Sequence, residues 1–74
     1  MYFVDVKRIK KLMVEHEIDT VEELSEKTGV NRNTLATVLN GKSYPSSMVM
    51  TKIGEALDIP AEDMGGIFFA RNSA

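Results

Sequence analysis

Residues 21–35 read VEELSEKTGVNRNTL, and this stretch decides the fold because it holds two helices and the turn between them. Thr20, three residues before Glu23, predicts a capping box in which the hydroxyl accepts from the Glu23 amide and the carboxylate accepts from the Thr20 amide. The helix that starts there ends at Gly29, since glycine readily takes the left-handed conformation that stops a helix. Asn31 is a good N-cap, so a second helix follows almost at once.

The turn between these two helices is so short that the helices must cross steeply. Such a crossing needs a small residue where the helices meet, which Ser25 provides, and a flexible residue in the turn, which Gly29 provides. The apolar residues available for the facing surfaces are Leu24, Val30, Leu35 and Val38. This spacing is typical of a DNA-binding helix-turn-helix, in which the first helix braces across the backbone and the second lies in the major groove.

Apolar residues at intervals of three and four predict three further helices around this pair. One covers residues 4–16, another follows a cap at Ser46 or Ser47, and the last starts at Pro60, which suits a first helical position. The residues expected to face inward are Val6, Ile9, Leu12, Met13 and His16 in the first of these, Met48, Val49, Ile53, Ala56 and Leu57 in the second, and Met64, Ile67 and Phe68 in the third.

The remaining signals complete an all-α fold. Asn40 and Gly41 close the helix that begins after Asn31, and Gly54 inside a helical stretch predicts close contact with another helix. No segment alternates long enough to make a strand. We therefore expect five short helices in one domain that takes up the whole chain, with a core over about 4–69 and a frayed end at 71–74.

Charge is unevenly distributed along the chain. Nine Lys and Arg against eleven Asp and Glu give a net charge of −2, and such a balance by itself argues against nucleic-acid binding. Residues 29–46, however, contain Arg32 and Lys42 and no acidic residue. The second helix of the pair therefore lies in a positive or neutral segment of an acidic protein.

Several function classes are excluded or disfavoured by composition. The absence of cysteine rules out a disulfide scaffold, a zinc knuckle and thiol catalysis. No run approaches the roughly 20 apolar residues of a membrane span. His16, the single histidine, lacks a nucleophile or a metal-ligand partner at helical spacing. We expect a soluble cytoplasmic protein without a membrane partner, which is not an enzyme and uses no metal or cofactor.

Three motifs resemble the Cro and repressor-type helix-turn-helix family, also called XRE-like: the run at 21–35, LNGK at 39–42 and IGEALDI at 53–59. The resemblance extends over about residues 6–68 and implies the five-helix lambda-repressor-like domain. The sequence departs from the family at three positions. Val21 stands where glutamine is frequent, Ser25 where alanine is usual, and Leu39 where an acid is common.

The second helix of the pair carries the candidate base contacts. With Leu35 and Val38 facing inward, its outer face near the N-terminal end presents Arg32, Asn33, Ala36 and Thr37. An arginine can donate two hydrogen bonds to guanine O6 and N7, an asparagine amide can pair with adenine, and a methyl group can pack on thymine. A solvated surface charge is the alternative for Arg32.

Polar side chains around this helix are candidate phosphate contacts, and the resemblance implies that the Asn-Gly-Lys segment grips phosphate. The candidates are Thr20, Asn31, Thr34, Asn40, Lys42, Ser43 and Tyr44. Such contacts set register rather than sequence preference. Asn31 and Asn40 are equally good capping residues, and the small number of cations predicts a modest salt dependence.

The C-terminal aromatic pair predicts a partner surface. Adjacent residues on a helix point about 100° apart, so Phe69 is expected outside if Phe68 enters the core. Ile67, Phe68 and Phe69, with Tyr2 and Phe3, form the candidate surface for a second copy or another protein. The alternative is an enlarged monomer core.

These features favour a sequence-specific regulator of transcription that binds double-stranded DNA. The expected form is a small Cro-like repressor that occludes a promoter as a homodimer on a pseudo-palindromic operator, with half-sites about 34 Å apart. The resemblance also suggests an origin on a prophage or another mobile element. Two alternatives remain: an antitoxin that docks its toxin near Phe69, and a protein-interaction module that keeps the fold without binding DNA.

Overall fold

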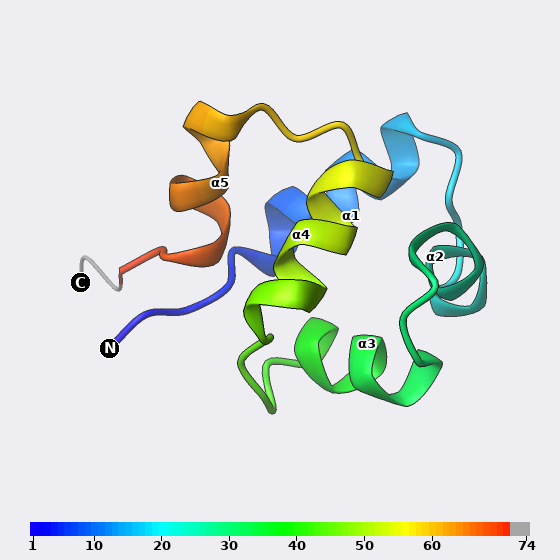
Figure 1. Ribbon diagram of the computed structural model, residues 1–74, viewed down its shortest axis with the longest axis horizontal. Coiled ribbons are helices and arrows are strands. Elements are labelled where there is room, and N and C mark those ends of the chain that lie inside the picture. The colour runs from blue at the N-terminus through cyan, green and yellow to red at the C-terminus, as the bar shows by residue number, and fades with distance from the viewer. Residues whose placement is uncertain (72–74) are drawn as a thin grey trace.

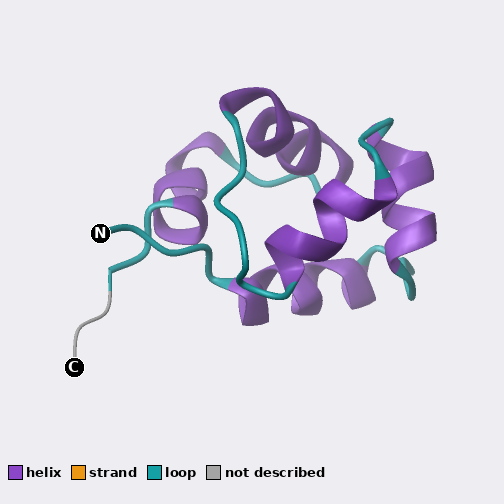
Figure 2. Ribbon diagram, turned by 90° about the horizontal axis from the view of Figure 1, so that it is seen from below, coloured by secondary structure: helices purple, strands orange, loops and turns teal. Residues whose placement is uncertain are grey.

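Five α-helices make up most of residues 1–71, the part of the chain that the computed structural model describes (Figure 1). They are α1 (Val6–Glu15), α2 (Val21–Thr28), α3 (Arg32–Leu39), α4 (Ser47–Ala56) and α5 (Ala61–Phe68). Within the described residues there is no strand, only an isolated antiparallel bridge between Phe3 and Ala70 (Figure 2). The predicted all-α fold with five helices is confirmed.

Side-chain caps begin four of the five helices. Asp5, Thr20, Asn31 and Ser46 each accept a hydrogen bond from a backbone N–H in the first turn of α1 to α4 respectively. The helix α5 has no such cap: Pro60 is its N-cap residue rather than its first helical residue, so the predicted start is one residue too early. Four local signals in the sequence thus fix where four helices begin.

The capping box at the start of α2 forms in a different way from the one predicted. The Thr20 hydroxyl accepts from the Glu23 amide at 3.1 Å, as expected. Its proton is then donated to the Glu23 carboxylate at 3.2 Å, whereas the prediction paired that carboxylate with the Thr20 amide. One hydroxyl therefore joins both groups of the same glutamate.

Glycines end α2 and α3 and allow α4 and α5 to approach. Gly29 and Gly41 lie directly after or one residue beyond these helix ends, with φ of 73° and 72°. In α4, a Cβ on Gly54 would stand 2.9 Å from the sulfur of Met64 in α5. The predicted close contact at Gly54 is confirmed, and its partner is α5.

The core lies where α2 packs against α3 and α4, and α1 against α5. Its buried residues are Ile9, Met13, Ile18, Leu24, Val30, Leu35, Leu39, Val49, Ile53, Leu57, Ile67 and Phe68. Met48 was predicted inside but is 64% exposed. The inward line of α4 runs through Val49, Ile53 and Leu57 at intervals of four, and Met48 lies about 100° away from Val49.

Both ends of the described chain lie together at one end of the long axis (Figures 1 and 2). Phe3 and Ala70 exchange two backbone hydrogen bonds of 2.8 and 3.0 Å. Arg71 stacks its guanidinium over the Tyr2 ring and donates to the Tyr2 hydroxyl. The predicted fraying is therefore wrong at Arg71, and residues 72–74 lie outside the described range.

Candidate nucleic-acid interface

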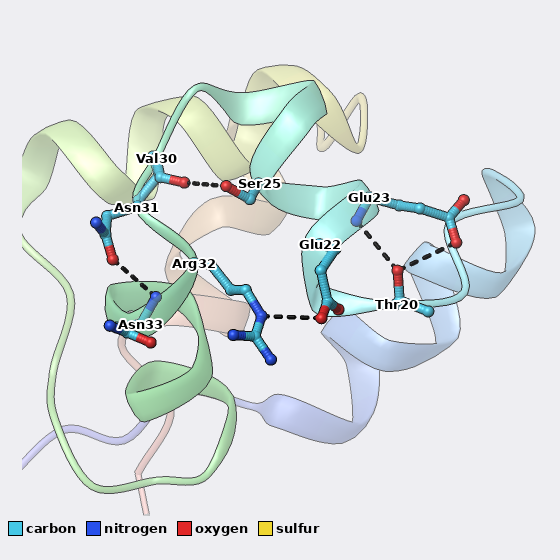
Figure 3. Close-up of polar contacts among 8 residues, drawn as sticks. All are labelled: Thr20, Glu22, Glu23, Ser25, Val30, Asn31, Arg32 and Asn33. Atoms are coloured by element: carbon cyan, nitrogen blue, oxygen red, sulfur yellow. Dashed lines mark hydrogen bonds and ion pairs between the residues drawn. The ribbon is translucent and has the colours of Figure 1, made fainter.

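Side-chain hydrogen bonds fix the turn between α2 and α3. The Ser25 hydroxyl donates to the Val30 carbonyl at 2.6 Å (Figure 3). The buried Thr28 hydroxyl donates to the Leu24 carbonyl at 2.8 Å and accepts from the Val30 amide at 3.1 Å. Because both polar groups of Val30 are paired with α2 side chains, the start of α3 is held at a fixed position relative to α2.

Arg32, the first residue of α3, forms an ion pair with Glu22 in the first turn of α2. Its Nε lies 2.9 Å from Oε2 of Glu22, and the side chains are 60% and 57% exposed. The carboxylate meets the guanidinium at Nε, near the base of the planar group (Figure 3). The pair was missed in the sequence because its members are ten residues apart on different helices, and no local pattern connects them.

The next two polar residues of this region divide into a cap and an exposed side chain. Asn31 accepts from the Asn33 amide through Oδ1 at 2.8 Å, which confirms the capping alternative and leaves its Nδ2 group as a donor. Asn33 is exposed, as is Arg32. The N-terminal end of α3 therefore presents side-chain donors to solvent.

The C-terminal end of α3 closes in a Schellman motif. The Lys42 amide donates to the Thr37 carbonyl at 2.9 Å and the Gly41 amide to the Val38 carbonyl at 3.1 Å. The Ser43 hydroxyl donates to the Thr37 hydroxyl at 2.9 Å. These bonds occupy the amides of Gly41 and Lys42, so an anion at Lys42 would meet its side chain rather than its amide.

The other predicted contact residues lie around the same surface. Thr20, Thr34, Thr37 and Asn40 are exposed, and the Thr34 carbonyl accepts from the Thr37 hydroxyl. Ala36 is half-buried because it lines a groove between α1 and α3 that it shares with Val21. The methyl group of Ala36 is therefore less exposed than predicted.

Residues 8–65 match the family model of the Cro/C1-type HTH DNA-binding domain. The chain belongs to this family. The match includes all of α2 to α4, with the helix pair at its centre. A comparison with curated proteins found no match, and a comparison with solved structures found none.

Membership of the Cro/C1-type family assigns DNA binding in transcription regulation to this chain. In a helix-turn-helix the second helix enters the major groove, and in the present domain that helix is α3. The exposed donors at its N-terminal end are placed where such a helix meets base edges. The geometry therefore agrees with recognition of DNA by α3.

One predicted phosphate contact has a structural role in the Cro/C1-type domain instead. The hydroxyl of Tyr44 donates to the carbonyl of Phe68 at the end of α5, so its only proton is used within the chain. Burial of the hydroxyl raises the pKa of Tyr44, and the neighbouring Tyr2 raises it further. The prediction for Tyr44 is corrected: the residue ties the loop after α3 to α5.

The predicted partner surface is wrong at two of its five residues, Ile67 and Phe68, whereas the inward position predicted for both from helical periodicity is confirmed. Ile67 and Phe68 are completely buried, because both point from α5 into the core. Phe69 is 46% exposed and packs edge-on against Tyr2, with ring centroids 5.4 Å apart. We define the terminal patch as the exposed aromatic side chains at this end, Tyr2, Phe3, Tyr44 and Phe69.

A metal site in the Cro/C1-type domain would require clustered titratable side chains, and a membrane span would require a long apolar helix. Residues 1–71 hold no group of three or more His, Cys, Asp and Glu side chains that could bind a metal ion. His16 contacts the Leu12 carbonyl through Nδ1 and Asp58 through Nε2 at 3.4 Å, so both ring nitrogens have partners. No helix in this range is long and apolar enough to span a membrane.

Proposed function

We propose that this protein is a cytoplasmic repressor that binds a pseudo-palindromic operator as a homodimer and thereby occludes a promoter. The observation that carries the proposal is the fixed α2–α3 pair, with Arg32 and Asn33 exposed at the start of the second helix. Residues 29–46 contain no acid, so this helix can approach the phosphate backbone despite the net charge of −2.

Base recognition is assigned to the outer face of α3. Arg32 donates two hydrogen bonds to guanine, and the Asn33 amide pairs with adenine. The Thr37 hydroxyl is engaged with Thr34 and Ser43, so its methyl group, with that of Ala36, is the part available to a thymine methyl. Four side chains from one face of one helix then read one half-site.

Phosphate contacts are assigned to the edges of this face. The candidates are the side chains of Thr20, Asn31, Thr34, Asn40, Lys42 and Ser43, all exposed. Lys42 is the only cation among them, so each half-site neutralises few phosphates. A weak dependence of affinity on salt follows, and sequence-independent binding is correspondingly weak.

The terminal patch is the surface assigned to the homodimer. The patch lies at one end of the longest axis, whose extent is 33 Å (Figure 1). Two copies joined at this patch form a symmetric dimer, whose two-fold axis matches the two-fold symmetry of a pseudo-palindromic operator.

The test is selection of binding sites from random duplex DNA by the purified protein at two salt concentrations. A palindromic motif with half-sites one turn apart is the expected result. Enrichment of a single half-site would contradict the dimer but not DNA recognition. No enrichment even at low salt would contradict DNA recognition by this chain alone, and would favour an antitoxin or an interaction module that acts with another protein.

A further inference from the structure

We infer that Glu22 is a positioning residue for base recognition, which holds the Arg32 guanidinium so that its terminal nitrogens form a fork for guanine. The inference rests on the proposed function and adds a specificity-determining residue from α2, the helix that does not enter the groove. It starts from the 2.9 Å contact between Nε of Arg32 and Oε2 of Glu22.

The ion pair contributes little to folding. Both side chains are more than half exposed, and exposed ion pairs stabilise proteins only slightly. The α2–α3 crossing is already fixed by the buried side chains of Leu24 and Leu35 and by the Ser25–Val30 hydrogen bond. The pair therefore affects mainly where the guanidinium points.

The direction of the guanidinium decides how it can read a base. Arginine can present two edges to a pair of acceptors, one made by Nε with a terminal nitrogen and one made by both terminal nitrogens. Glu22 contacts Nε and therefore occupies the edge that Nε shares with one terminal nitrogen (Figure 3). The remaining edge is the one that matches O6 and N7 of guanine when the side chain approaches end-on.

Glu22 also acts on selectivity through its charge. Its carboxylate lies beside the helix that enters the groove and repels phosphate, so binding to DNA of unrelated sequence is weakened. At an operator, Arg32 meets guanine and the pair retains its geometry. The carboxylate thus reduces non-specific binding and orients the fork with the same contact.

The test uses an operator obtained by selection. The guanine that Arg32 reads is identified as the operator position at which the Arg32→Ala variant no longer prefers guanine over other bases. This guanine is replaced by 7-deazaguanine, which lacks the N7 acceptor. For the wild-type protein we expect a loss of affinity of about 10-fold. For Glu22→Ala we expect a loss below about 3-fold, with unchanged penalties at all other operator positions.

Two further variants separate charge from geometry. Glu22→Gln retains an oxygen that can accept from Nε, and we expect its 7-deazaguanine penalty to lie between those of the wild type and Glu22→Ala. Glu26→Gln removes the same charge one turn along α2 without a contact to Arg32, so it should keep the wild-type penalty. Circular dichroism of each variant verifies that the fold is intact.

The positioning role would be overturned if Glu22→Ala still lost affinity by the full 10-fold on the 7-deazaguanine operator. It would equally be overturned if this variant bound the unmodified operator more tightly than the wild type and kept that loss. The second result would mean that Glu22 masks Arg32 instead of presenting it. A wild-type protein that selects no operator would overturn the proposed function and the positioning role together. A protein that selects an operator but whose Glu22→Ala variant keeps the full loss on 7-deazaguanine would therefore contradict the positioning role and leave the proposed function intact.

Discussion

The hydroxyl of Ser25 donates a 2.6 Å hydrogen bond to the carbonyl of Val30, five residues later and on the far side of the turn between α2 and α3. Alanine is usual in this family at the Ser25 position, so the hydroxyl is an addition that had to find a partner. It finds one in a carbonyl of the turn itself. The bond links the two helices at the point where the orientation of α3 is decided.

Replacing Ser25 by alanine should lower the free energy of unfolding by about 0.5–1.5 kcal/mol. The Val30 carbonyl loses its partner, while alanine gains slightly in helix propensity. Urea denaturation followed by circular dichroism measures the change. Ser47→Ala, at an exposed position in the first turn of α4, is the control. Equal stability of the two variants would show that the bond contributes nothing.

Arg32→Lys should lose guanine preference while retaining the positive charge. Lysine has no planar fork, so it cannot reproduce a bidentate contact. We expect a reduction of operator affinity by about 1–3 kcal/mol and a nearly unchanged affinity for unrelated DNA. Competition binding with both duplexes measures the two values. An equal loss on both duplexes would mean that Arg32 contacts phosphate rather than a base.

Lys42→Ala should weaken binding to every duplex by a similar factor. Its side chain is assigned to phosphate, so its removal lowers the magnitude of the salt slope by about 0.9. Binding isotherms at several salt concentrations give that slope. Lys52→Ala is the control, because Lys52 lies on the exposed face of α4 outside the assigned contacts. A sequence-dependent effect of Lys42→Ala would contradict the phosphate assignment.

Tyr44→Phe should lower the free energy of unfolding and should make this free energy depend less on pH in the alkaline range. The folded chain raises the pKa of Tyr44 above its ordinary value of 10.0, so it holds this proton more tightly than the unfolded chain does. The resulting stability is complete below pH 10 and is lost as the pH rises through the folded pKa. The variant also loses the hydrogen bond to Phe68, at a cost of about 0.5–1.5 kcal/mol.

Unfolding by urea at pH 8 and above pH 10 tests this. The difference in stability between wild type and Tyr44→Phe should narrow at the higher pH, because the wild type loses the contribution of its tyrosine hydroxyl there. A difference that stays constant across this range would contradict the coupling of the proton to folding.

Phe69→Asp should dissociate the proposed dimer without unfolding the monomer. The side chain is 46% exposed, so the charge can remain in water in the monomer but would be desolvated between two copies. Sedimentation equilibrium measures the mass. Phe68→Ala, from the core, is expected to reduce stability by about 3–5 kcal/mol instead. A wild-type monomer at all concentrations would contradict the dimer.

The sequence predicted what depends on local signals. Thr20, Asn31 and Gly29 specify helix ends through contacts within a few residues, and the helices begin and end at these residues as predicted. The errors at helix starts are small, and the prediction for Tyr44 failed at a contact between distant parts of the chain. The hydroxyl of Tyr44 reaches a carbonyl 24 residues away, and no local pattern connects the two groups.

The candidate site divides in the same way. The outward positions of Arg32 and Asn33 follow from helical periodicity, and the structure leaves both exposed. The Glu22 partner of Arg32 required the crossing angle of α2 and α3, which depends on the packed core. Which bases the residues of α3 contact is a property of the complex with DNA, and it stays a prediction.

The two hydrogen bonds between Phe3 and Ala70 have a mechanical consequence. Both chain directions leave this antiparallel bridge toward the same side, so a pull on the ends loads the bonds one after the other, as in a zipper. Such an arrangement yields at low force. Tension applied through the termini would therefore open the contact between Arg71 and Tyr2 first and then separate the Tyr2 and Phe69 rings, and it would leave the α2–α3 pair, which contributes no residue to the terminal patch, assembled.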